Sequence, residues 1–189
     1  MPEYTVRWGG RGGDYWDAIL SEFKGRDVAG LEIGTFEGKG AAWFLDNVLT
    51  HPQSSLVCVD PFVGLLEYTD ADRDALYNRC ISNLSSYSRV KIVKGRSQDV
   101  LRTMDEKFHF IYIDGDHHAK AVLDDAVLAF RLLHYGGIMI FDDYEWQDPR
   151  EPALVDAPKL GIDAFLRAYQ GYYNVVYKGY QIVIRKIRQ

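Results

Sequence analysis

Two pairs of carboxylates each follow an apolar run of strand-like composition. Asp114 and Asp116 follow one run, and Asp142 and Asp143 follow the next. Because the carboxyl ends of neighbouring parallel strands open onto one crevice, we expect the four side chains to converge. Two like charges about 4 Å apart repel by roughly 1–4 kcal/mol, depending on the local dielectric. A bound divalent cation would offset this repulsion, and Mg²⁺ in particular prefers oxygen ligands.

Such a cation would activate a hydroxyl group. A hydroxyl bound to a divalent ion loses its proton more readily, as metal-bound water does, and Asp116 is a candidate proton acceptor. His117 and His118 follow directly. Either is a candidate general base near neutral pH or a softer ligand that favours zinc or iron. The alternatives are that the histidines only begin a helix and that the aspartates only cap helices or turns.

A glycine-rich turn follows the first apolar run of the chain. Gly34, Gly38 and Gly40 let the backbone turn sharply and approach a ligand closely. Their spacing, G-x-x-x-G-x-G, differs from the G-x-G-x-x-G of dinucleotide-binding proteins. Asp60, about 20 residues further on, ends the second run, where an acidic residue can accept the hydroxyls of a ribose. The alternatives are an ordinary strand–helix connection and a turn-stabilising role for Asp60.

The elements that must position these residues alternate between strand and helix patterns, which predicts βαβ units and a parallel sheet. The expected strands span residues 28–33, 56–60, 90–93, 108–114, 137–142, 175–178 and 181–187. The expected helices span residues 14–23, 41–48, 70–84, 118–133 and 161–169. Only Gly179 and Tyr180 separate the last two strands, so these should pair as an antiparallel hairpin. Asp124 and Asp125 lie opposite the apolar stripe of their helix, which predicts a solvated face.

Composition narrows the class of protein. The chain has 189 residues, of which 47% are hydrophobic, and this predicts a single domain over residues 1–189. The net charge of −5 argues against nucleic acid as the main partner. No apolar run approaches the roughly 18 residues that span a bilayer, which argues against membrane insertion. The two cysteines lie within apolar patterns and indicate a reducing, cytoplasmic setting.

The order of these motifs resembles that of class I S-adenosylmethionine-dependent methyltransferases. The likeness is carried by Glu32-Ile33-Gly34, Asp60, Ser97-Gln98 and Asp114, and it covers nearly the whole chain. It implies an α/β fold with a Rossmann-like, seven-stranded, mostly parallel sheet, one antiparallel strand and helices on both faces. It also implies S-adenosylmethionine as cofactor. The residues that this assigns to the cofactor are Glu32, Gly34, Thr35, Gly38, Asp60, Ser97, Gln98 and Asp114.

Within this assignment, Gly34 and its neighbours would flank the methionine part of the cofactor. Asp60 would hold the ribose, and Ser97 and Gln98 would lie beside the adenine. Ser97 is an equally good candidate for a helix N-cap. Phe36 departs from the commonest fingerprint, because many members have a second glycine at that position.

A narrower resemblance is to the bacterial metal-dependent O-methyltransferases of sugars and natural products. It implies that Asp114, Asp142 and Asp143 bind the metal, Mg²⁺ or another divalent cation, and that Asp116 is the base. The substrate would be a small hydroxylated molecule. Two alternatives remain: a metal-independent methyltransferase with His117 or Asp116 as base, and a nucleoside-binding module without catalysis.

Two segments are expected to border the site. Residues 1–13 include the run Gly9-Gly10-Arg11-Gly12-Gly13, which predicts a hinged N-terminal arm that closes over the cofactor. Residues 144–159 contain three prolines and predict a loop over the active site. Tyr144 and Trp146 in this loop are candidates for stacking on an acceptor. Aromatic residues of the arm also make a homo-oligomer possible.

Overall fold

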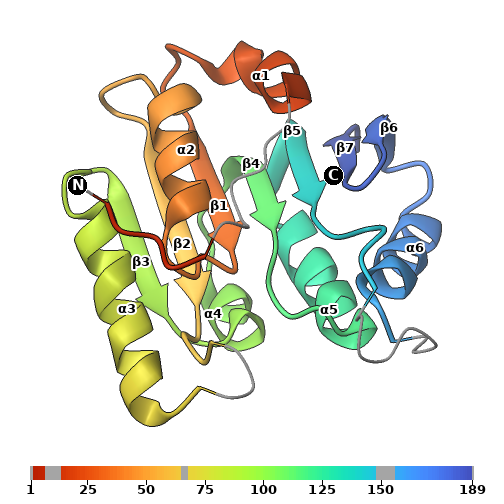
Figure 1. Cartoon of the computed structure of the whole chain (residues 1–189). Helices are drawn as coiled ribbons and strands as arrows, with labels where there is room; N and C mark the ends of the chain where they lie inside the picture. The colour runs from red at the N-terminus through yellow and green to blue at the C-terminus, as the bar shows by residue number, and fades with distance from the viewer. Residues whose placement is uncertain (1, 7–13, 65–67, 148–155, 189) are drawn as a thin grey trace. The chain divides into compact units, whose positions relative to one another are not determined.

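The computed structural model describes residues 2–6, 14–64, 68–147 and 156–188. The seven strands form one sheet in the order β3-β2-β1-β4-β5-β7-β6, which confirms the expected mostly parallel sheet with one reversed strand (Figure 1). The chain divides into two compact units, residues 1–96 and 97–189. That these units form a single domain stays a prediction. No helix in the described ranges is long and apolar enough to cross a membrane.

The first unit contains three parallel strands and the helices between them. It begins with α1 (Asp14–Leu20) and the short helix η1 (Ser21–Phe23), and continues with β1 (Ala29–Ile33), α2 (Lys39–Asn47), β2 (Ser55–Asp60), α3 (Asp70–Leu84) and β3 (Val90–Lys94). Ladders of hydrogen bonds pair β1 with β2 and β2 with β3. Because four of the five β1 residues are buried, the glycine-rich turn leaves β1 from a rigid part of the core.

The second unit contains α4 (Ser97–Thr103), β4 (Phe108–Ile113), α5 (Ala119–Phe130), β5 (Leu133–Phe141), α6 (Pro158–Ala168), β6 (Tyr173–Lys178) and β7 (Ile182–Lys186). β4 and β5 are parallel. β7 runs antiparallel to both β5 and β6, so the predicted hairpin is confirmed. This hairpin returns the chain to the end of β5, next to the Asp142–Asp143 pair.

Several predicted boundaries were wrong. The helix predicted for residues 118–133 ends at Phe130, and β5 begins at Leu133 rather than at residue 137. α6 begins at Pro158 rather than at residue 161, because a proline is compatible with the first turn of a helix. The predicted loop over residues 144–159 therefore ends earlier, and residues 148–155 lie outside the described residues. The predicted glycine hinge, residues 9–13, also lies outside them.

Candidate functional site

The acidic pairs leave two neighbouring strands at the same edge of the sheet. Ile113, the last residue of β4, is the register partner of Phe141, the last residue of β5. The backbone N–H of Asp142 then donates to the carbonyl oxygen of Ile113 at 2.9 Å. Asp114 and Asp142 therefore start from adjacent backbone positions, as expected for residues at the carboxyl ends of neighbouring parallel strands.

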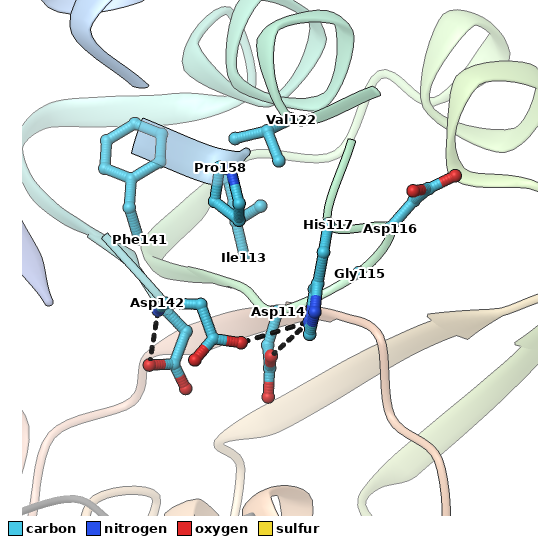
Figure 2. A pocket seen from close by; sticks show the side chains of 10 residues that line it. Ile113, Asp114, Gly115, Asp116, His117, Val122, Phe141, Asp142 and Pro158 are labelled. Carbon is cyan, nitrogen blue, oxygen red and sulfur yellow. Dashed lines mark hydrogen bonds and ion pairs between the residues drawn. The ribbon is translucent and has the colours of Figure 1, made fainter. Parts of the chain in front are cut away.

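Three side chains form a compact group that suits a metal ion. His117 Nε2 lies 3.0 Å from Asp143 Oδ2 and 3.8 Å from Asp114 Oδ1. One ligand atom from each of the three residues lies within 4.8 Å of the others, and the described ranges contain no second group of this kind. Figure 2 shows His117 pointing toward Asp114 at the mouth of a pocket that β4, β5 and α5 line.

The carboxylate of Asp142 accepts hydrogen bonds from donors of the protein itself. One of its carboxylate oxygens accepts hydrogen bonds from Gln181 Nε2 and from the backbone N–H of Asp143, both at 2.8 Å. The other accepts a short hydrogen bond from the hydroxyl of Tyr112. The same hydroxyl lies 3.0 Å from Asp114 Oδ2. Tyr112 and Gln181 thus offset much of the repulsion that a cation was expected to offset.

The tip of the β6–β7 hairpin holds the segment that follows β5. The hydroxyl of Tyr180 donates to Asp143 Oδ1 at 2.6 Å, and the carbonyl oxygen of Tyr180 accepts from the N–H of Tyr144 at 2.8 Å. Sequence patterns did not indicate the roles of Tyr112, Tyr180 and Gln181. The one available signal was the polar Gln181 at the start of an apolar strand, where it is buried.

Burial and mutual repulsion shift the titration of this group. Burial, reinforced by the charges of Asp142 and Asp143, raises the pKa of Asp114 to about 7, although His117 opposes the shift. Burial and Asp142 likewise raise the pKa of Asp143. Burial alone would lower the pKa of His117, but its interactions with Asp114 and the other nearby carboxylates outweigh this and raise the pKa. Perturbed groups clustered in a pocket are typical of a functional site.

The other two base candidates pair with each other. His118 Nδ1 lies 2.5 Å from Asp116 Oδ1, and this hydrogen bond is the main cause of a raised pKa for His118. Both side chains are more than half exposed, and Asp116 points away from Asp114 in Figure 2. His117 instead packs against the Trp146 ring, with centroids 4.8 Å apart. Of the three candidates, only His117 contacts Asp114 and Asp143.

The glycine-rich turn in the first unit is shaped by left-handed residues. Gly34 has φ 87°, Phe36 φ 50° and Gly38 φ 82°. The carboxylate of Asp60 accepts from the N–H groups of Phe36 at 2.8 Å and Phe62 at 2.6 Å. Burial raises the pKa of Asp60, although these hydrogen bonds oppose the shift. Asp60 therefore stabilises the turn, which was the alternative to ribose binding.

Glu32 and Thr35 are both buried beside this turn, at 1% and 4% exposure. Glu32 is the register partner of Cys58 on β2. Burial raises the pKa of the Cys58 thiol well above its usual value, and Glu32 adds to the shift. A carboxylate held in the core at a strand end, next to a glycine-rich turn, suits recognition of a polar ligand group.

Ser97 and Gln98 both bind Asp125 in the second unit. Ser97 Oγ donates to Asp125 Oδ1 at 2.6 Å, and Gln98 Nε2 donates to the same oxygen at 3.0 Å. Asp125 is 1% exposed, so the prediction of a solvated face was wrong for this residue. The apolar stripe of α5 covers one side of the helix, but α4 packs on α5 as well and covers Asp125.

Solved structures share this fold at low sequence identity. A putative rRNA-methylase from Clostridium thermocellum has a TM-score of 0.69 and 15% identity over 92% of this chain and 96% of that chain. The O-methyltransferase TomG from Streptomyces achromogenes, solved with SAM and involved in tomaymycin synthesis, has a TM-score of 0.68 and 17% identity over 94% and 81%.

A curated relative and a family match agree with the fold. The uncharacterized protein R132 of Acanthamoeba polyphaga mimivirus is 28% identical over 144 residues, which cover 72% of this chain. The chain spans 62% of the length of R132. Residues 31–144, from within β1 to the segment after β5, match the family described as a methyltransferase domain. The chain therefore belongs to the methyltransferase-domain family and has the fold of class I S-adenosylmethionine-dependent methyltransferases.

Proposed function

We propose that the protein transfers a methyl group from S-adenosylmethionine to a hydroxyl of a small molecule, with a divalent cation bound at the ends of β4 and β5. The observation that carries this proposal is the group formed by Asp114, His117 and Asp143, whose ligand atoms lie within 4.8 Å of one another. The likeness to TomG, which is named an O-methyltransferase, supports the same reaction class.

The residues of the first unit suit the cofactor. The turn from Gly34 to Gly38 supplies backbone that a ligand can approach closely, and the buried carboxylate of Glu32 stands at its start. A carboxylate has about four lone-pair sites, so Asp60 can accept ribose hydroxyls while it holds the N–H groups of Phe36 and Phe62. We assign Glu32, Gly34, Thr35, Gly38 and Asp60 to the cofactor.

In the second unit we assign Ser97 and Gln98 to the adenine. Asp125 takes the amide nitrogen of Gln98, which leaves the amide oxygen as the acceptor for an adenine amino group. Asp125 thereby fixes which way the Gln98 amide faces. Asp114 is assigned to both the cofactor amine and the metal.

The donor set suits a divalent ion that binds both oxygen and nitrogen ligands. Two carboxylates and one imidazole would hold it, and the imidazole favours Mn²⁺, Fe²⁺ or Zn²⁺ over Mg²⁺. We assign Asp114, Asp143 and His117 as ligands. Asp142 was also predicted as a ligand, but its contacts with Tyr112 and Gln181 suit a supporting role.

The protein's part in the reaction is positioning and proton removal. S-Adenosylmethionine is an activated donor, and a bound cation would lower the pKa of the acceptor hydroxyl. The hairpin tip would keep Asp143 in place through Tyr180. The exposed Asp116–His118 pair would then receive the proton. A short path for the proton and a fixed acceptor geometry are what the chemistry requires.

A second candidate is a metal-independent methyltransferase with His117 as base. The 3.0 Å contact between His117 and Asp143 favours it, since a carboxylate orients an imidazole and raises its basicity. The same group of residues serves both candidates, so cation dependence separates them.

The acceptor we propose is a small molecule rather than nucleic acid. One structural neighbour is called a putative rRNA-methylase. This chain carries a net charge of −5, which disfavours binding to the phosphate backbone of a nucleic acid. Methylation of RNA fragments at a rate above that of small acceptors would contradict the assignment.

The deciding experiment measures methyl transfer from S-adenosylmethionine to a panel of sugars, phenols and hydroxylated amino acids. The protein is treated with EDTA and then supplied with Mg²⁺, Mn²⁺ or Zn²⁺. Loss of transfer in EDTA and recovery with a cation supports the metal-dependent reaction. Full transfer in EDTA supports the His117 mechanism. Cofactor binding without transfer to any acceptor supports a non-catalytic module.

A further inference from the structure

The N-terminal segment is tied to the glycine-rich turn through one buried carboxylate. Glu37, in the middle of the turn, is 2% exposed. Its side chain accepts hydrogen bonds from the N–H of Thr5 at 2.8 Å and from the Thr5 hydroxyl. Arg79 on α3 donates to the same carboxylate at 2.9 Å. A buried carboxylate with this many donors is a strong anchor, because charge-assisted hydrogen bonds are shorter and stronger than neutral ones.

A second side chain repeats the connection. Asn83 on α3 accepts from the N–H of Glu3 at 2.8 Å and donates to the carbonyl oxygen of Glu3 at 2.9 Å. The same amide also donates to the carbonyl oxygen of Glu37 at 2.9 Å. Residues 2–6, drawn in red in Figure 1, are thus tied to the turn in two ways. They bind the buried Glu37 of the turn directly, and they bind the buried Asn83, which in turn binds Glu37.

The turn needs such support. Phe36 adopts φ 50°, in the left-handed region that residues other than glycine rarely occupy. A strained backbone persists only where surrounding contacts hold it. Asp60 holds the N–H of Phe36 on one side. Glu37, the next residue, is held by Thr5, Arg79 and Asn83 on the other.

We propose that residues 2–6 form a latch that fixes the glycine-rich turn in its ligand-binding shape, with Glu37 as the positioning residue. The inference rests on the proposed cofactor site in that turn. Attachment of the latch and binding of the cofactor are then coupled. Because coupling between two sites is reciprocal, loosening the latch weakens cofactor binding, and cofactor binding protects the latch.

The test uses the full chain with Thr5→Val, which removes the hydroxyl donor on the exposed latch and leaves the turn unchanged. Calorimetry with S-adenosylhomocysteine should show affinity weakened by about fivefold to tenfold. Hydrogen exchange should be faster at residues 2–6 and 34–38 without ligand. The control is Thr103→Val. The Thr103 hydroxyl donates to the carbonyl oxygen of Val100 in its own helix, and the affinity of this variant should equal that of the wild type.

A second variant, Glu37→Gln, keeps the shape of the side chain and removes the charge that pairs with Arg79. It should weaken S-adenosylhomocysteine binding more than Thr5→Val does. Wild-type affinity in both variants, or exchange at residues 2–6 that is unchanged by the ligand, would overturn the latch alone. Failure of the wild type to bind S-adenosylhomocysteine would instead overturn the proposed function and, with it, the coupling.

Discussion

The side-chain amide of Gln181 donates a hydrogen bond to the carboxylate of Asp142 at 2.8 Å, although 39 residues separate the two in the chain. The Tyr112 hydroxyl takes the other oxygen of Asp142. Asp143, the next residue, instead directs an oxygen to His117 at 3.0 Å. Two adjacent aspartates thus have different surroundings. Both carboxylate oxygens of Asp142 accept from protein donors, whereas Asp143 accepts from Tyr180 with one oxygen and contacts His117 with the other.

This difference predicts unequal effects on metal binding. Asp143→Asn removes a proposed ligand and should abolish Mn²⁺ binding in the micromolar range. Asp142→Asn removes a supporting carboxylate and should weaken Mn²⁺ binding by about tenfold. Electron paramagnetic resonance of free Mn²⁺ measures both affinities without turnover. Equal losses in the two variants would show that Asp142 is a ligand after all.

Tyr112→Phe should destabilise the protein. The phenol hydroxyl lies within hydrogen-bond distance of both Asp142 and Asp114, and its loss removes the donor that offsets the repulsion between these two half-buried carboxylates. Hydrogen bonds to charged groups contribute about 1.5–3 kcal/mol, so the free energy of unfolding should fall by about that amount. Chemical denaturation at neutral pH measures it.

Tyr135→Phe is the matched control for that experiment, because Tyr135 is 67% exposed on the same strand pair. Its free energy of unfolding should stay within about 0.5 kcal/mol of the wild-type value, as for most surface substitutions. An equally small change in Tyr112→Phe would mean that a bound cation or water replaces the phenol.

The two adjacent histidines should differ in their effect on catalysis. His117→Ala removes either a metal ligand or the base and should lower kcat by about 10²–10⁴-fold. His118 is paired with Asp116 at the surface, so His118→Ala should lower kcat by less than about tenfold. Steady-state kinetics with a shared acceptor decides this. A larger loss in His118→Ala would show that His118, rather than Asp116, accepts the proton within this pair.

The positions of the strand ends were predictable because they depend only on the sequence pattern and on chain connectivity. Asp114 and Asp142 follow apolar runs, and the carboxyl ends of parallel strands meet at one edge, so their proximity followed from the pattern alone. The hairpin followed equally from the short connection, Gly179 and Tyr180, between the last two predicted strands. These inferences need only periodicity and chain connectivity.

The partners of the aspartates were not predictable in this way. Tyr180 reaches Asp143 across 37 residues and Gln181 reaches Asp142 across 39. These contacts depend on the register of β7 against β5, which strand patterns leave open by one or two residues. Strand patterns therefore predicted a cation to offset the repulsion, whereas Tyr112 and Gln181 offset much of it.

Asp125 shows the same limit on a helix. Helical periodicity places Asp125 opposite the apolar stripe of α5, but it does not reveal that α4 packs there and brings Ser97 and Gln98 to the carboxylate. Burial raises the pKa of Asp125 from 3.8 to about 6, although the hydrogen bond from Ser97 opposes the shift. Asp125, which was predicted to lie at the surface, is thus a buried group with a raised pKa.

That pKa predicts how stability depends on pH. Between pH 3.8 and about 6 the unfolded chain releases the Asp125 proton while the folded chain retains it. The folded state then binds more protons, so the free energy of unfolding falls as pH rises. The loss is complete above about pH 6 and amounts to about 3 kcal/mol.

Asp125→Asn isolates this contribution, because its amide oxygen can still accept from Ser97 and Gln98 but does not titrate. From about pH 4 to pH 7, the stability of the wild type should fall relative to the variant by about 2–3 kcal/mol. Urea denaturation of both proteins across this range measures the difference. Parallel profiles would mean that the carboxylate is ionised in the folded protein at pH 4, since only a group that keeps its proton on folding makes the two curves diverge.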